Sequence, residues 1–144
     1  MPLGAAAKLR ASTANLFQPA EYSALCTVDL PAGSTGVDIT GATVTFTTIN
    51  ANAAFTARAT FDVDLTGAAT TTSTGFLVVD GAVQSAEAHF AAEVSTDRGT
   101  CYQQWTGTLA TPGSHTIKLR GTTGANVTMR LTHTNLTVTI TEVI

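Results

Sequence analysis

Two carboxylates are the residues of this chain best spaced to do chemistry together. Asp62 and Asp64 lie two positions apart, so both project from one face of an extended strand. Paired carboxylates can bind a cation or perform acid–base chemistry. The commoner origin of such a pair is the solvated face of an edge strand, and we favour this interpretation.

Histidines and cysteines form no recognisable ligand set. His115 and His133 flank expected strands and are predicted to be hydrogen-bonding residues at strand ends. Cys26 and Cys101 belong to no Cys-x-x-Cys or mixed Cys/His motif. We expect two free thiols, since a reducing cytoplasm disfavours disulfides. No metal site and no cofactor site is therefore predicted.

Motifs of catalysis and nucleotide binding are missing as well. The sequence has no Gly-x-Ser-x-Gly elbow, no Gly-x-Gly-x-x-Gly loop and no P-loop. With 29 threonines in 144 residues, a Ser-His-Asp arrangement could not be told from chance. Charged residues make up 12% of the chain, about half of the roughly 25% usual in soluble domains. We predict no catalytic residues and a non-enzymatic role.

Charge and hydropathy exclude two classes of partner. Seven basic residues stand against ten acidic ones and form no cluster, whereas nucleic-acid binding requires grouped Lys and Arg. The longest strongly apolar run, residues 76–79, is far shorter than the ~20 residues that span a bilayer. Lys8 and Arg10 follow a short alanine run, which reverses the order of a signal peptide. We expect assembly in a cytoplasm.

The elements that position these residues are strands. Residues 55–65 alternate strictly: Phe55, Phe61 and Leu65 share one face with small apolar residues, and threonines and charges share the other. Asp80-Gly81 between two apolar runs indicates a tight hairpin, because a type I′ turn needs positive φ at both central residues. Eight or nine strands at 8–12-residue spacing predict an all-β sandwich or barrel.

The first 24 residues are different. They contain few β-branched residues, and Pro19 would interrupt a helix there. We predict an extended N-terminal arm over residues 1–24 and one β domain over residues 25–144. The arm's apolar residues are candidates for contact with a partner: Leu3, Leu9, Leu16, Phe17 and Tyr22.

Three segments carry a resemblance to a known group of domains. They are Gly-Phe-Leu-Val-Val-Asp-Gly at 75–81, Gly-Ser-His-Thr-Ile-Lys-Leu-Arg at 113–120 and Thr-Asn-Leu-Thr-Val-Thr-Ile-Thr-Glu-Val at 134–143. In this order they resemble the jelly-roll domains of virion proteins of tailed bacteriophages, especially phages of actinobacteria. More remotely, they are similar to the trimeric C1q/TNF-like heads. The resemblance covers residues 37–144 and implies a two-sheet antiparallel jelly-roll sandwich.

What the resemblance implies for function is a structural role on a virion. We expect a homotrimer that decorates and cements a capsid, with the arm bound to the major capsid protein. Tyr102 and Trp105 lie on opposite faces of one expected strand and are candidates for the subunit interface, where aromatic residues are enriched. The alternative is a tail or fibre head that binds a host-surface glycan.

Overall fold

The computed structural model describes residues 17–67 and 70–143, and within them every regular element is a strand. The strands are β1 (Phe17–Leu25), β2 (Val37–Thr48), β3 (Ala53–Leu65), β4 (Thr71–Val79), β5 (Ala82–Ala92), β6 (Arg98–Leu109), β7 (Gly113–Thr122) and β8 (Val127–Val143). No helix in this part of the chain is long and apolar enough to cross a membrane.

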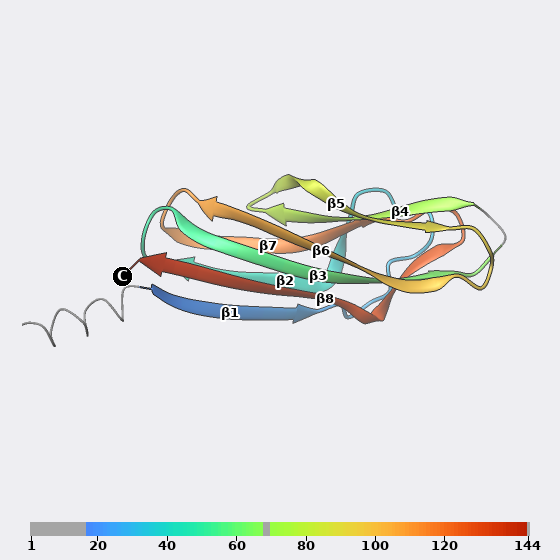
Figure 1. The fold of residues 1–144 in the computed structure, drawn as a ribbon, viewed down its shortest axis with the longest axis horizontal. Helices are drawn as coiled ribbons and strands as arrows, with labels where there is room; N and C mark the ends of the chain where they lie inside the picture. The colour runs from blue at the N-terminus through green and yellow to red at the C-terminus, as the bar shows by residue number, and fades with distance from the viewer. Residues whose placement is uncertain (1–16, 68–69, 144) are drawn as a thin grey trace, which may run out of the picture.

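The strands form two antiparallel four-stranded sheets that pack face to face (Figure 1). One sheet has the order β1-β8-β3-β6 and the other β2-β7-β4-β5. The first strand pairs with the eighth, the second with the seventh, the third with the sixth and the fourth with the fifth. This nested pairing is that of a jelly roll, and it confirms the predicted fold class.

Strand β3 shows why the sequence folds this way. The apolar row predicted from its alternation, from Phe55 to Leu65, faces the opposite sheet and is almost completely buried. Most of the other strands alternate in the same manner, and one continuous core fills the space between the sheets. Threonine is the commonest residue at the outward positions, which helps to account for the low charge of the chain.

Two phenylalanines of β3 need glycine beside them. A Cβ added to Gly75 on β4 would lie 2.4 Å from the Phe61 ring, and one added to Gly107 on β6 would lie 2.7 Å from the Phe55 ring. Real Cβ atoms do not approach so closely, and protein interiors leave few gaps to absorb a shift. The two glycines therefore act as the spaces into which the largest core side chains of β3 fit.

The hairpin predicted at Asp80-Gly81 is present between β4 and β5. Val79 pairs with Ala82, and the two residues between them have φ angles of 47° and 87°. Positive φ at both positions is the requirement of the type I′ turn.

The predicted arm is shorter than expected, because residues 17–25 form β1 and pair with β8 from Phe17–Val143 to Leu25–Asn135. β1 is an edge strand, where a proline such as Pro19 is tolerated because one side of the strand needs no ladder partner. Only residues 1–16 of the predicted arm are left, and they lie outside the described residues.

Substitution of Gly75 by alanine is expected to destabilise the fold, because the added methyl group clashes with the fully buried Phe61 ring. Overpacking of this kind costs about 1–3 kcal/mol. Chemical denaturation monitored by Trp105 fluorescence would measure the loss. Gly99→Ala is the comparison, since Gly99 is not in a positive-φ conformation and its Cβ would come no closer than 3.2 Å to the partly exposed Phe90 ring; a Gly75 variant no less stable than that one would contradict the packing argument.

Candidate functional site

The outer face of the β1-β8-β3-β6 sheet presents regular rows of side chains. Where all four strands pair, cross-strand register forms four rows, which are Pro19–Thr141–Ala54–Thr108, Glu21–Thr139–Thr56–Thr106, Ser23–Thr137–Arg58–Gln104 and Leu25–Asn135–Thr60–Tyr102. Seven of these sixteen residues are threonines, and only Glu21 and Arg58 carry charge. We call these four rows the threonine face.

Tyr102 stands out on the threonine face. Its side chain is 57% exposed, and its hydroxyl donates a hydrogen bond to Gln104 Oε1. Leu25, at the other end of the same row, is 69% exposed. Depletion of charge and an exposed tyrosine are features of protein–protein interface cores, so this face has the composition of a surface that another protein covers.

Trp105 does not lie on that surface, so its prediction as an interface residue is wrong. Its side chain is buried in the core, and Nε1 donates a 2.7 Å hydrogen bond to the Ala86 carbonyl of β5. Because β5 belongs to the opposite sheet, Trp105 joins the two sheets at their edge. Sequence alternation had separated the two aromatic residues correctly, without indicating which face was the inner one.

Tyr22 is also placed differently from the prediction. Its ring is half-buried and stacks on Phe46 of β2, with ring centroids 5.1 Å apart. It therefore packs against the core instead of lying free on the surface. Leu3, Leu9 and Leu16 lie outside the described residues, and of Phe17 only the backbone pairing in β1 is described.

Asp62 and Asp64 are not on a solvated edge, because β3 is an interior strand. Asp62 is 1% exposed and accepts a 3.0 Å hydrogen bond from Arg98. Arg130 lies 2.8 Å from Asp64 and 3.0 Å from Asp29. Each carboxylate thus has a guanidinium partner, and the cluster is an ion-pair network that ties β3 to its two neighbours. No three possible metal ligands come together in the described ranges.

His115 forms a polar cluster with residues of three other segments. Its Nδ1 lies 2.7 Å from Asp80 Oδ2, while Nε2 lies 3.2 Å from Thr48 Oγ1 and 3.0 Å from the Thr111 carbonyl. The order hydroxyl, imidazole, carboxylate matches a hydrolase triad. Thr48 is 2% exposed, however, so a substrate could not reach its hydroxyl. The cluster joins the Asp80-Gly81 turn to β7 and to the loop before it.

The Asp80 carboxylate is held in its charged form by this cluster. Burial alone would raise its pKa, but the hydrogen bonds from His115 and from the Thr116 amide outweigh burial and keep the pKa below its ordinary value of 3.8. Sequence reasoning identified Asp80 only as a turn residue, because the carboxylate and the imidazole are 35 positions apart.

The two cysteines are free. Cys26 follows β1 and Cys101 lies on β6, so β8 and β3 stand between them in the sheet. Three inter-strand steps of about 4.8 Å separate them by roughly 14 Å, whereas a disulfide needs Cα atoms 4.4–6.8 Å apart. Burial raises the pKa of both thiols, which makes them poor nucleophiles.

Comparisons with known proteins identify the fold and not the family. No protein-family model matches the sequence, and no curated protein is significantly similar to it. Murine APRIL has a similar structure, with 11% identity and a TM-score of 0.51 over 85% of this chain and 98% of that chain. Dimeric latent PorU from Porphyromonas gingivalis gives 12% identity and a TM-score of 0.52 over 88% of this chain and 13% of that chain.

A third similar structure is Eiger TNF from S. frugiperda, with 7% identity and a TM-score of 0.47. The jelly-roll fold expected from the sequence is confirmed by the structural similarity to murine APRIL. None of these three structures is a bacteriophage protein, so the virion part of the resemblance stays a prediction.

Replacement of Asp80 by asparagine tests the His115 cluster. Asparagine tolerates the positive φ of the turn but loses the charge, and we expect a destabilisation of about 1 kcal/mol at pH 6, discounted for partial exposure. The native pKa of Asp80 is lowered, so its stabilisation is lost as pH falls through that pKa. The difference in unfolding free energy between the parent protein and Asp80→Asn should therefore shrink between pH 4 and pH 2.

Glu93→Gln is the control for this experiment, because the structure gives that exposed side chain no hydrogen-bond partner among the described residues. Urea denaturation at each pH would give the free energies. A difference between Asp80→Asn and the parent that stays constant down to pH 2 would rule out stabilisation by the Asp80 carboxylate.

Proposed function

We propose that this protein is a non-enzymatic structural module that associates with copies of itself through the threonine face, and that the resulting homotrimer decorates a bacteriophage capsid. The observation that carries the self-association is the low charge of the threonine face, which has two charged residues in sixteen. The other charges of that sheet's outer face lie beyond these rows, in the ion-pair network of Asp62 and Asp64. The outer face of the opposite sheet carries four charged residues in two adjacent rows, namely Asp38, Lys118, Arg120 and Glu87.

Physical chemistry favours the threonine face for a partner of the same kind. Covering a charged side chain removes it from water at a cost of several kcal/mol unless it is paired. Covering threonine methyl groups, Leu25 and the Tyr102 ring has a favourable hydrophobic contribution instead. A weakly charged surface also lets identical copies meet without like-charge repulsion. The resemblance to C1q/TNF-like heads favours three copies.

Residues 1–16 would serve as the attachment to the shell in this proposal. Their leucines, Leu3, Leu9 and Leu16, lack the periodicity of a self-contained element. Laid on the major capsid protein, each buried leucine could contribute roughly 1.5–3 kcal/mol. Three such segments on one trimer would act together, so their avidity would exceed the affinity of one. The location on a capsid surface rests on the resemblance to virion jelly rolls.

Self-association is tested by placing a charge at the exposed aromatic position. We expect the unmodified protein to be trimeric at micromolar concentration and Tyr102→Arg to be monomeric, because three copies of the new charge would be desolvated at one interface. Light scattering coupled to size exclusion measures the mass. Thr45→Arg, on the outer face of the other sheet, is the matched control and should stay trimeric. A monomeric parent protein, or a trimeric Tyr102→Arg, would refute the assigned interface.

Attachment is tested separately by deleting residues 2–16, which leaves β1 intact because that strand begins at Phe17. The shortened protein should remain a folded trimer and lose shell binding, measured by co-sedimentation with purified capsids. Full occupancy of capsids by the shortened trimer would exclude the arm as the anchor. Detection of the protein only on the tail, by labelled electron microscopy of intact particles, would favour the tail or fibre alternative.

A further inference from the structure

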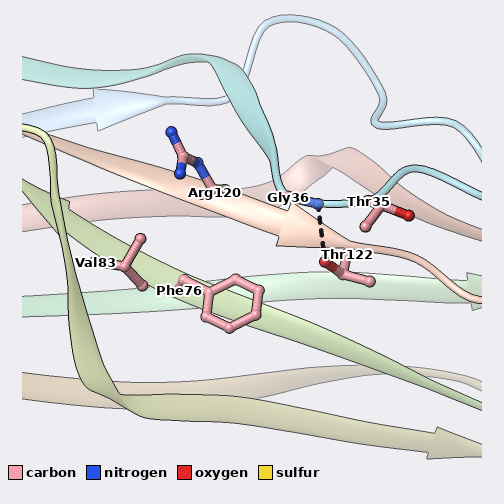
Figure 2. Close-up of a pocket in the computed structure, with 6 residues that line it drawn as sticks. All are labelled: Thr35, Gly36, Phe76, Val83, Arg120 and Thr122. Carbon is pink, nitrogen blue, oxygen red and sulfur yellow. Dashed lines mark hydrogen bonds between the residues drawn. The ribbon is translucent and has the colours of Figure 1, made fainter.

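A hollow lies on the outer face of the β2-β7-β4-β5 sheet, away from the threonine face. It is lined by residues of three strands and of the loop before β2, namely Thr35, Gly36, Phe76, Val83, Arg120 and Thr122 (Figure 2). Its volume is about 210 Å³. Pockets for drug-sized molecules occupy roughly 300–1,000 Å³, so this hollow has room for a single small ring.

The apolar part of the hollow comes from Phe76 and Val83. Figure 2 shows the Phe76 ring between Val83 and Thr122, with its flat side toward the viewer. Val83 is 49% exposed, and Phe76 is partly exposed. An exposed aromatic ring beside a concave space offers an apolar platform for the C–H groups of a ring-shaped ligand.

Arg120 supplies positive charge above this platform. It is the cross-strand neighbour of Phe76 on one side and of Asp38 on the other. Its Nε donates a 2.9 Å hydrogen bond to Asp38 Oδ1, which fixes the guanidinium, while its two terminal nitrogens make no hydrogen bond within the described residues. An anchored guanidinium with free donors is suited to binding a carboxylate.

The charge on the Arg120 side of the hollow is positive, whereas Glu87, the cross-strand neighbour of Phe76 on the other side, lies 3.1 Å from His89. Lys118 also donates to Asp38, and this hydrogen bond, together with the one from Arg120, keeps the pKa of the Asp38 carboxyl below its ordinary value. Two cations therefore share one anion, and the trio retains a charge of +1. A neutral ligand would leave this surplus without a counter-charge.

The rim of the hollow provides a hydroxyl group and is open to solvent. Thr122 Oγ1 accepts a 3.0 Å hydrogen bond from the Gly36 amide, which leaves its O–H free to donate to a ligand. Gly36 has a φ of 58°, and a Cβ added to it would meet no atom within 4 Å, so the backbone passes the hollow without filling it. The hollow is open to solvent on this side and would admit a ring that belongs to a longer chain.

From these four features we propose that the hollow binds one acidic sugar residue, a pyranose that carries a carboxylate, within a glycan. The carboxylate would pair with the free nitrogens of Arg120, the apolar side of the ring would lie on Phe76, and a ring hydroxyl would accept from Thr122. A fatty acid would satisfy Arg120 and Phe76 but would leave the Thr122 hydroxyl without a partner. A neutral sugar would leave the positive charge uncompensated.

This site does not depend on the proposed function. It lies on the sheet opposite the threonine face, so a monomer and a trimer would both present it. In a trimer, three weak sites would engage one polysaccharide together. Loss of sugar binding and loss of self-association can therefore be observed separately.

The experiment is a titration of the ¹⁵N-labelled full chain with glucuronate, with glucose as the neutral counterpart of the same size. We expect saturable shifts of the Gly36, Phe76, Arg120 and Thr122 amides with a dissociation constant in the millimolar range, as is usual for a ligand of this size. Binding should weaken as salt is added. Glucose should bind at least tenfold more weakly. Equal affinity for both sugars, or no saturable shift with glucuronate, would overturn the proposal.

Two variants that should still fold test whether binding depends on the residues of the hollow. Arg120→Gln should reduce glucuronate affinity at least tenfold, and Phe76→Leu should reduce the affinity for glucuronate while a salt dependence remains. Arg58→Gln removes an exposed arginine from the threonine face and should leave binding unchanged. Retained affinity in folded Arg120→Gln, or an equal loss in Arg58→Gln, would show general charge attraction and would refute a built site.

Discussion

The fit of Phe61 over Gly75 is the contact on which the rest of the sandwich depends. It sets how closely β3 of one sheet approaches β4 of the other, since the ring occupies the space that a Cβ would take. The core combines small residues such as Ala57 and Ala59 with large, fully buried ones such as Leu77 and Ile117. Truncation of any of these large side chains would leave a cavity in this core. The spacing of the sheets in turn determines which residues face outward.

Charged residues are distributed unevenly over the two outer faces, although both faces are rich in threonine. Charges gather where they have partners: Asp62 and Asp64 with Arg98 and Arg130 at one end of β3, and Asp38 with the two cations of β7. Ion pairs in such networks help to fix strand neighbours, and they leave the threonine face almost free of charge. One face is thus suited to contact with a protein surface and the other to a small anionic group.

The predictable part of this structure came from local patterns, and the remainder depended on long-range neighbours. Strict alternation revealed the buried row of β3, and the Asp80-Gly81 pair revealed its hairpin. Residues 17–25 carry no strand signal of their own, since they have few β-branched residues and contain Pro19; β8 makes them a strand by offering a partner. The His115 cluster and the hollow could not be predicted, because each assembles residues from strands that are distant in the chain.

The pairing of β1 with β8 has a mechanical consequence. Phe17 and Val143 are register partners, so the two ends of the described chain leave the sandwich side by side. Antiparallel hydrogen bonds run across the strands. A force that pulls these two ends apart would therefore break the hydrogen bonds between β1 and β8 one after another. Such peeling opens a sheet at far lower force than shearing, in which all the bonds of a strand resist together. If a particle exerted a pulling force on both ends of this protein, β1 would detach first and the rest of the jelly roll would stay folded.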